Sequence, residues 1–285
     1  MKYNEMEKRF KENYEMRSRQ YLYRRTPVII RLDGKAFHTF TKGLKKPFDD
    51  ILIESMQDTM KYLCENIQGC VLGYTQSDEI SLLLVDYQDL DSCAWFDYRL
   101  DKLLSVSASM ATFAFNKSFS KKVEIWTDVF YESWNKTNED KKYLSIIEKR
   151  VEQGALFDSR AFNLPKEEVT NYFFSRQNDA TRNSIQMVGQ YYFSQSELHK
   201  KKVNDIQDML LTKKDVNWNN FSTTKKRGSC CIRNKIIIST DGNTVTCQLR
   251  DPKKPENAWV IDNNIPIFKD NNRDYIEKLF MIGGL

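Results

Sequence analysis

Two aspartates occupy positions where the sequence pattern predicts that a β-strand gives way to a turn. Asp33 follows residues 28–32, in which apolar side chains recur at every second position, as in a half-buried strand. Asp78 falls in a polar turn between two apolar stretches, residues 71–74 and 80–85, a pattern typical of a hairpin. Carboxylates held in this way can bind two Mg²⁺ ions roughly 3.5–4 Å apart for phosphoryl transfer. Mg²⁺ prefers oxygen ligands and takes one or two carboxylates together with substrate phosphates.

Neither stretch is specific when it is considered alone. Asp-Gly pairs and Ser-Asp-Glu turns are common in ordinary surface loops, so an ordinary turn competes with a metal site as the interpretation of each. The two stretches occur in this order with a helix predicted between them, and together they favour the metal site.

The remaining pattern predicts the elements that would position these aspartates. Helices with one apolar face cover a sheet, and the helix that begins at Pro165 also carries a polar stripe at Arg176, Asp179 and Asn183. Residues 123–153 are interpreted as an insertion without an assigned structure. Apolar spacing predicts helices over residues 3–25, 47–63 and 92–122, a strand over 157–162, a hairpin over 236–249 and a closing helix over 275–280.

Composition and missing motifs exclude several classes of protein. No apolar run approaches the ~20 residues that a membrane helix needs, and the first residues lack the apolar core of a secretory signal. Six cysteines without a Cys-x-x-Cys motif indicate reduced thiols in the cytoplasm, and two histidines argue against a zinc site. Neither a P-loop nor a Gly-x-Gly-x-x-Gly motif is present.

Basic residues gather in the last third of the chain, where Trp218 and Phe221 lie among them. This composition suits phosphate contact and stacking on unpaired bases, although solvated lysines on a protein surface give the same pattern. The net charge of +5 fits an RNA-binding enzyme but does not identify one. The basic clusters are Lys200–Lys202, Lys213–Lys214 and Lys225–Arg227.

Six ordered motifs together resemble the tRNA-His guanylyltransferase superfamily, whose members are 3′-to-5′ nucleotide polymerases that act on tRNA 5′ ends. The resemblance spans about residues 5–235 and extends more loosely from Trp259 to the C-terminus. The motifs are Arg31-Leu32-Asp33-Gly34 with Phe37-His38, Lys46-Pro47-Phe48-Asp49, Tyr74-x-Gln76-Ser77-Asp78-Glu79, Phe157-Asp158-Ser159-Arg160, Arg176-Gln177-x-Asp179 and Lys226-Arg227-Gly228.

The predicted β-α-β-β-α-β order indicates an α+β fold of the ferredoxin-like type. With the two acids placed on its first strand and central hairpin, this fold is the palm of nucleic-acid polymerases and of nucleotidyl cyclases. It is an antiparallel sheet with helices on one face, followed by a C-terminal α/β extension. We expect a palm-like catalytic domain over residues 1–190, which includes the insertion at about 123–153. Residues 191–285 would form an extension that contacts RNA and packs on the palm.

The resemblance also implies roles for individual residues. Asp33 and Asp78 would bind two Mg²⁺ ions with the carbonyl of Gly34, and Glu79 is a further candidate catalytic acid whose direction the sequence leaves open. The nucleotide-binding residues would be Asp33, Gly34, Lys35, Ala36, Phe37, His38, Lys46, Asp49, Ser77 and Asp78. Contacts to RNA or phosphate would come from Arg160, Arg176, Asp179, Asn183, Lys225, Lys226 and Arg227.

The implied activity is nucleotide addition to the 5′ end of tRNA, with ATP activating a 5′-monophosphate and GTP or another NTP supplying the added nucleotide. The resemblance further implies a cytoplasmic homo-oligomer, commonly a tetramer. Members that add one untemplated G to tRNA-His carry His-Ile-Asn-Asn after the Arg-Gln-x-Asp motif, whereas this chain has Thr181-Arg182-Asn183-Ser184. This departure favours templated repair of 5′-truncated tRNA, as in the bacterial, archaeal and viral relatives.

Three alternatives remain open from the sequence. They are a strict guanylyltransferase for tRNA-His, a non-catalytic RNA-binding module of ferredoxin-like fold, and a palm-type nucleotide cyclase. Fold analogy cannot choose among these chemistries.

Overall fold

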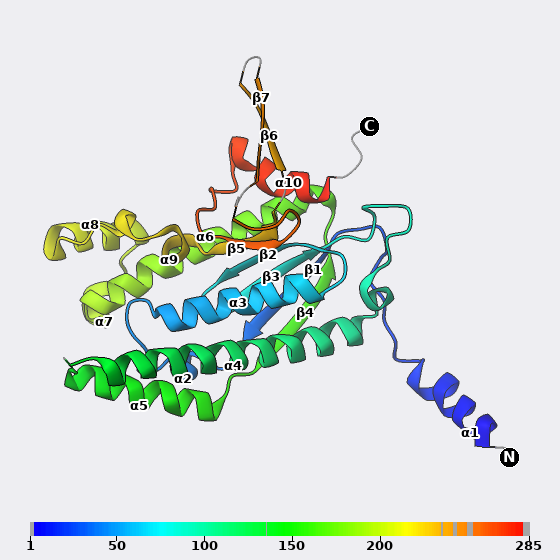
Figure 1. The fold of residues 1–285 in the computed structure, drawn as a ribbon, viewed down its shortest axis with the longest axis horizontal. Helices are drawn as coiled ribbons and strands as arrows, with labels where there is room; N and C mark the ends of the chain where they lie inside the picture. Colours follow the sequence, from blue (N-terminus) through cyan, green and yellow to red (C-terminus); the bar gives the residue numbers. More distant parts are fainter. Residues whose placement is uncertain (1–2, 135, 235, 242–243, 250–252, 282–285) are drawn as a thin grey trace.

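A six-stranded antiparallel sheet forms the centre of the molecule (Figure 1). The computed structural model describes residues 3–134, 136–234, 236–241, 244–249 and 253–281. The strands lie in the order β4-β1-β3-β2-β5-β8. Their bounds are β1 Val28–Gly34, β2 Cys70–Gln76, β3 Glu79–Leu84, β4 Phe157–Asn163, β5 Ser229–Arg233 and β8 Trp259–Asp262.

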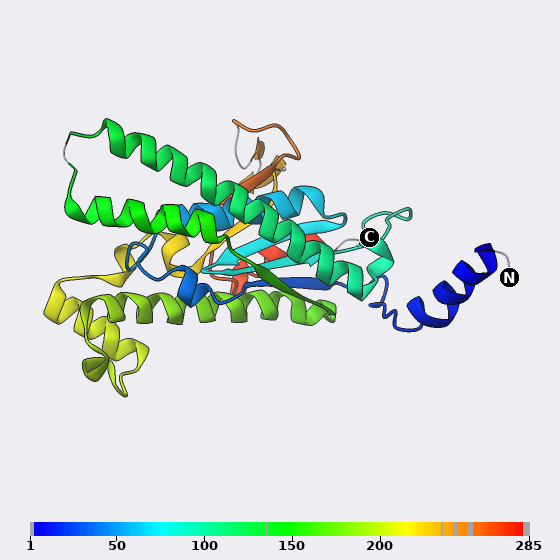
Figure 2. The same ribbon diagram turned by 90° about the horizontal axis from the view of Figure 1, so that it is seen from below.

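The first four strands and two helices confirm the predicted ferredoxin-like palm. The chain order is β1, α3 (Asp50–Asn66), β2, β3, α4 (Leu100–Glu132) and β4, and the four strands lie side by side as β4-β1-β3-β2. Helices α3 and α4 cover one face of this sheet (Figure 2). Strands β5 and β8 of the C-terminal part extend the same sheet beyond β2.

The opposite face of the sheet is also covered, by α6 (Lys166–Tyr192) and α10 (Asp274–Phe280). Ile29 points to this face and is fully buried in one apolar cluster with Val169 and Phe173. The expectation of a half-buried strand holds from residue 30 on, where Arg31 and Asp33 are only partly buried, and fails at Ile29. The alternating pattern of the strand does not reveal this burial, because the helices that cover the second face, α6 and α10, come after β4 in the sequence.

The second palm helix and the segment after it differ from the prediction. Helix α4 begins at Leu100, after the short 3₁₀ turn η2 (Trp95–Tyr98), and continues to Glu132, so the expected bounds of 92 and 122 were wrong. Helix α5 (Asn138–Gln153) then runs back along α4, beginning at a capping box between Thr137 and Asp140. The unassigned insertion is thus a helical hairpin that packs on the palm.

The N-terminal helix is shorter than predicted and lies away from the sheet (Figures 1 and 2). It comprises α1 (Tyr3–Phe10) and the π-helical turn η1 (Lys11–Glu15), so the prediction of a helix to residue 25 was wrong. After it, the Arg24 guanidinium binds the buried carboxylate of Asp86 at 2.7 Å and ties this segment to the palm.

The remaining elements complete the C-terminal part. The predicted hairpin is confirmed as the two-stranded sheet of β6 and β7, and Gly242 of the predicted turn lies outside the described residues. Helix α10 confirms the closing helix. No helix in the described ranges is long and apolar enough to cross a membrane. The other elements are α2 (Phe37–Phe40), α7 (Gln195–Leu198), α8 (Val203–Lys214), η3 (Trp218–Asn220), α9 (Thr223–Arg227), β6 (Ile236–Asp241), β7 (Thr244–Leu249) and η4 (Asp270–Asn272).

An aromatic cluster around Phe115 joins α4 to the segment that follows β1. The Phe115 ring lies 5.5 Å from the ring of Phe37, 5.7 Å from that of Phe40 and 5.4 Å from that of Phe157. Edge-to-face pairs at these distances add to the free energy of apolar burial. The cluster therefore supports the end of β1 from beneath.

We expect the substitution Phe115→Ala to lower the free energy of unfolding by about 3–5 kcal/mol, because it leaves a cavity in a close-packed core. Phe113 on the same helix is 57% exposed, so Phe113→Ala should cost less than about 1 kcal/mol. Urea unfolding followed by circular dichroism measures both values. Equal losses for the two variants would contradict this description of the core.

Candidate active site

The end of β1 and the turn between β2 and β3 are joined by a backbone hydrogen bond. The Gly34 N–H donates to the carbonyl oxygen of Asp78 at 3.0 Å. In the β1–β3 ladder Asp33 lies directly opposite Glu79. The predicted hairpin is confirmed, with Ser77 at φ 55° in its tight turn. The two aspartates that the sequence singled out are thereby brought together.

Gly34 is required by the close approach of the next helix. A Cβ at this position would lie 2.2 Å from the ring of Phe37, which is itself buried in the aromatic cluster. Only glycine therefore permits the chain to leave β1 and enter α2 at this angle. A backbone carbonyl such as that of Gly34 is one of the oxygen ligands that can complete a metal site formed by carboxylates.

The carboxylates of Asp33 and Asp78 are held in an electrostatically unfavourable environment. Burial raises the pKa of Asp33, and the charges of Glu79 and Asp158 raise it further. Burial also raises the pKa of Asp78, and the charge of Asp33 adds to this effect. In the described part of the chain no lysine or arginine nitrogen lies within 4 Å of either carboxylate. A divalent cation would relieve this repulsion.

The donor set at these two residues fits Mg²⁺. Both side chains offer hard oxygen ligands, and within the described residues no group of three or more His, Cys, Asp or Glu side chains is arranged to hold a metal. Backbone oxygens, water and substrate phosphates would have to complete the coordination shell. Mg²⁺ is commonly bound in this way, by few carboxylates and by the phosphates of its substrate.

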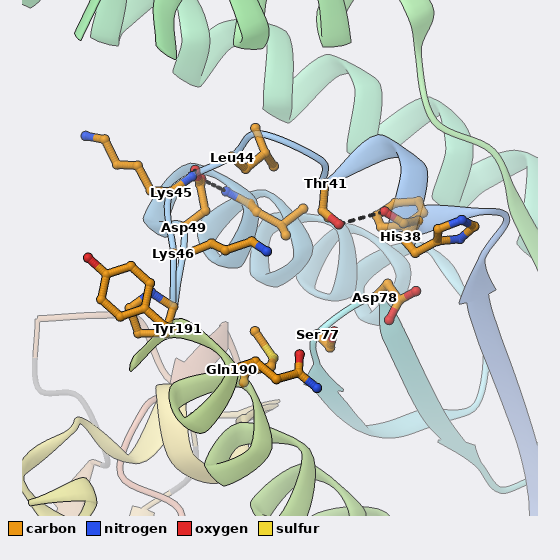
Figure 3. A pocket seen from close by; sticks show the side chains of 14 residues that line it. His38, Thr41, Leu44, Lys45, Lys46, Asp49, Ser77, Asp78, Gln190 and Tyr191 are labelled. Carbon is orange, nitrogen blue, oxygen red and sulfur yellow. Dashed lines mark hydrogen bonds between the residues drawn. The ribbon is translucent and has the colours of Figure 1, made fainter. Parts of the chain in front are cut away.

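A cleft of about 450 Å³ lies beside Asp78 (Figure 3). Its volume is in the range of small-molecule sites. The ammonium group of Lys46 points into the cleft, whereas that of Lys45 points away from it. The cleft is lined by Phe37, His38, Thr41, Leu44, Lys45, Lys46, Pro47, Asp49, Leu52, Ser77, Asp78, Met187, Gln190 and Tyr191.

The sequence analysis missed the wall of the cleft that α6 provides. Met187 lies one turn before Gln190 and Tyr191 on this helix, and all three line the cleft. Figure 3 shows Gln190 and Tyr191 on the side of the cleft opposite the loop that carries Lys46. Continuing the predicted polar stripe from Asn183 by the helical period leads to Met187 and then to Gln190. The helical spacing therefore pointed to these positions, but a methionine and an isolated glutamine do not by themselves indicate a binding site.

Glu79 is engaged by α6 and does not line the cleft. The Arg176 guanidinium donates to both Glu79 oxygens at 2.7 and 2.6 Å, and also to Asp179 at 2.6 Å. Asp179 also accepts a hydrogen bond from Arg182. The bond to Glu79 raises the pKa of Arg176 well above its usual range. This network links α6 to the start of β3, next to the acidic pair.

The carboxylate of Asp49 is occupied by contacts within the protein. It caps α3 by accepting from the Leu52 N–H at 3.0 Å, and it accepts from the Lys45 N–H at 2.9 Å. It also accepts from the Tyr143 hydroxyl at 2.7 Å. Asp49 is only 4% exposed, so this predicted nucleotide-binding residue shapes the loop around Lys46.

The remaining predicted residues lie outside the cleft. Lys35 and Ala36 form the turn before α2, where the Lys35 N–H donates to the carbonyl of Leu156. Arg160 lies exposed on the edge strand β4. Asn183 is exposed on α6.

The predicted basic run in α9 is also engaged by the protein. The Lys225 ammonium binds Asp50 at 2.8 Å, and the Lys226 ammonium donates to the carbonyl of Asn219 at 2.6 Å. Burial lowers the pKa of Lys226. The backbone carbonyl of Arg227 accepts from the Tyr74 hydroxyl at 2.8 Å. The described structure therefore places this run beside the N-terminus of α3, not in open solvent.

Comparison with known proteins agrees with these motifs. Residues 7–165 match the protein family described as tRNAHis guanylyltransferase. The chain is 26% identical over 279 residues to the tRNA(His) guanylyltransferase of Debaryomyces hansenii, covering 92% of this chain and 94% of that enzyme. It is also similar to the solved structure of a bacterial tRNA(His) guanylyltransferase-like protein in complex with ATP. The TM-score is 0.75 and the sequences are 38% identical, and the match covers 96% of this chain and 99% of that protein. The solved structure of such a protein in complex with GTP gives a TM-score of 0.70 and 36% identity, and the match covers 97% of this chain and 99% of that protein.

The repulsion at the acidic pair predicts that Asp78→Asn stabilises the metal-free protein. A raised pKa means that the folded state binds the proton more tightly, so stability falls as the pH rises through that pKa. At neutral pH the variant should melt a few degrees above the wild type in EDTA. The difference should shrink as the pH is lowered, because the wild-type carboxylate then becomes neutral.

Differential scanning fluorimetry measures this difference, with Asp128→Asn at an exposed position as the charge-matched control. Added Mg²⁺ should raise the melting temperature of the wild type and of the control more than that of Asp78→Asn. A variant that is less stable than the wild type in EDTA would show that Asp78 is not electrostatically strained.

Proposed function

The chain belongs to the tRNAHis guanylyltransferase family and is a nucleotidyltransferase, and we propose that it adds nucleotides to the 5′ end of tRNA in a Mg²⁺-dependent reaction. The observation that carries this proposal is the cleft that has Asp78 at one end and the Lys46 ammonium pointing into it. A nucleoside triphosphate fits a cleft with this distribution of charge.

In this proposal one group of residues at the site binds metal ions and another group binds the nucleotide. Asp33, Asp78 and the Gly34 carbonyl would hold two Mg²⁺ ions, which lower the pKa of an attacking hydroxyl and neutralise charge on the triphosphate. The Lys46 ammonium would bind the triphosphate, and Ser77 and His38 would contact the nucleotide beside it. The positive charge of Lys46 is free to do so because it points into the cleft, away from the rings that hold Lys45.

The proposed reaction has two steps. First, an oxygen of the tRNA 5′-monophosphate attacks the α-phosphorus of ATP and expels pyrophosphate, which leaves an adenylylated 5′ end. The 3′-hydroxyl of an incoming NTP then attacks the former 5′-phosphate of the tRNA and expels AMP. A 5′-triphosphorylated end can be attacked directly by the same hydroxyl, with pyrophosphate as the leaving group.

The proposal assigns tRNA contact to residues outside the cleft. The exposed side chains of Arg160 and Asn183 can reach a phosphate backbone without breaking a contact inside the protein core. Residues 191–285 would form the RNA-contacting extension of a palm over residues 1–190. Arg176 and Glu79, which neutralise each other, would instead hold α6 in place.

We further propose templated repair of truncated 5′ ends as the specific reaction. The positions that carry histidine and the second asparagine in G-adding relatives are Thr181 and Ser184 here. The Thr181 hydroxyl donates to the Gln177 carbonyl at 2.9 Å, and the buried Ser184 hydroxyl accepts from the Trp218 indole N–H at 2.8 Å. Both side chains are thus engaged locally and supply no imidazole that could stack on a base.

The test of templated repair is a set of 5′-truncated tRNAs that differ only at the base opposite the missing nucleotide. Each is offered all four NTPs together with Mg²⁺. We expect the added nucleotide to follow Watson–Crick pairing, with G restored opposite C and U opposite A. Entry of G on every template, and only on tRNA-His, would instead support the strict guanylyltransferase. A failure to transfer label from α-³²P-ATP to 5′-monophosphorylated tRNA would favour the non-catalytic module.

The role of Lys46 predicts a loss of nucleotide affinity in Lys46→Ala. A charge-assisted contact to phosphate contributes about 1.5–3 kcal/mol, so we expect the KM for ATP to rise roughly 10- to 100-fold. Lys42→Ala is the matched control, because this exposed lysine lies in the same loop but does not line the cleft. Steady-state kinetics at saturating tRNA measures both. Similar KM values for the two variants would remove Lys46 from the triphosphate site.

A further inference from the structure

Several contacts connect the α4–α5 hairpin to the loop that carries Lys46. The Arg150 guanidinium donates to the Lys42 carbonyl at 3.0 Å on the exposed side of this loop, and a second hydrogen bond is buried. The Tyr143 hydroxyl, on α5, donates to the Asp49 carboxylate at 2.7 Å across 94 positions of the sequence. Neither Tyr143 nor any other residue of α5 lines the cleft. The hairpin therefore reaches the cleft indirectly, through loop residues that line it, and Asp49 is the one that it contacts by a buried hydrogen bond.

Asp49 is the residue that fixes the shape of this loop. One carboxylate oxygen accepts from the Leu52 N–H and starts α3, and the other accepts from the Lys45 N–H. The second oxygen also accepts the Tyr143 hydroxyl. Because the backbone of Lys45 is held on one side of Lys46 and the start of α3 on the other, these bonds determine where the Lys46 side chain leaves the backbone.

The side chain of Lys45 is held by the same hairpin. Its ammonium lies 4.6 Å from the centre of the Tyr143 ring and 5.4 Å from the centre of the Trp126 ring. Cation–π contacts of this kind stabilise a lysine over an aromatic face. Figure 3 shows Lys45 directed away from the cleft and Lys46 directed into it. The hairpin thus holds one of the two neighbouring lysines and leaves the other for a ligand.

Tyr143 is itself rigidly placed. It is 6% exposed and packs edge-to-face on Trp126, with ring centres 5.1 Å apart, and Trp126 stacks on Phe130. Burial raises the pKa of Tyr143 well above its usual range, and the charge of Asp49 raises it further. The hydroxyl therefore stays protonated and remains a donor to Asp49.

We propose that Tyr143 is a positioning residue for nucleotide binding, and that the α4–α5 hairpin sets the position of Lys46 through the Tyr143–Asp49 hydrogen bond. This inference rests on the proposed function, since it concerns the same cleft. It gives the segment that the sequence left unassigned a specific role, which is to hold the loop that carries Lys46 in place through its contacts with Asp49 and Lys45. A purely structural tyrosine would instead affect stability and leave nucleotide affinity unchanged.

The test is Tyr143→Phe, which keeps the ring under Lys45 and removes only the hydroxyl. We expect the KM for ATP to rise roughly five- to tenfold, which is less than in Lys46→Ala because the lost hydrogen bond acts on the triphosphate only through the loop, with kcat within about twofold of the wild type. The affinity for Mg²⁺–ATP, measured by calorimetry without tRNA, should fall by the same factor. Tyr98→Phe is the matched control, because Tyr98 is buried and its hydroxyl has no hydrogen-bond partner among the residues that the structure describes.

A double-mutant cycle shows whether Tyr143 acts through Asp49. In an Asp49→Asn background, adding Tyr143→Phe should change the affinity for Mg²⁺–ATP by less than about twofold. An undiminished effect in that background would overturn the proposal, as would a lower melting temperature of Tyr143→Phe with wild-type affinity. Because calorimetry needs no turnover, a wild type that binds Mg²⁺–ATP but does not modify tRNA would refute the proposed function and leave this test intact.

Discussion

The hydrogen bond between the Gly34 N–H and the Asp78 carbonyl is the constraint on which the candidate site depends. It joins the end of β1 to the turn between β2 and β3, and so brings Asp33 and Asp78 together. Two ionised carboxylates in a partly buried environment repel each other, so their placement here is electrostatically unfavourable. The backbone ladder of the sheet supplies the stabilisation that opposes this repulsion.

The sheet can hold this arrangement because both of its faces are buried. One apolar cluster lies beneath α3 and α4, and a second lies beneath α6 and α10. A row of acids crosses three adjacent strands, with Asp158, Asp33 and Glu79 in register. Only Glu79 in this row is neutralised within the protein by a bidentate arginine, Arg176. The pKa of Asp33, in the middle of this row, is instead raised by burial and by the charges of both neighbouring acids.

The sequence predicted the parts of the site that depend on local pattern. The strand that ends at Asp33 and the hairpin turn at Asp78 follow from alternation and turn chemistry, and both were confirmed. The partners of Glu79 and Asp49 depend on tertiary contacts, because Arg176 and Tyr143 lie about a hundred residues away from them. Helix α5 was missed because charged residues dominate it and only a few of its side chains are buried.

Helix α6 also has a mechanical consequence. At 1.5 Å per residue it is about 40 Å long, and the Arg176–Glu79 pair fixes it to the sheet near its middle. Its C-terminal third carries the wall of the cleft on one side. On another side it packs against α8 and η3, where the Ser184 hydroxyl accepts from the Trp218 indole. The same turns of α6 thus carry both the wall of the cleft and the packing surface for α8 and η3, so a shift of this end of the helix would move both together.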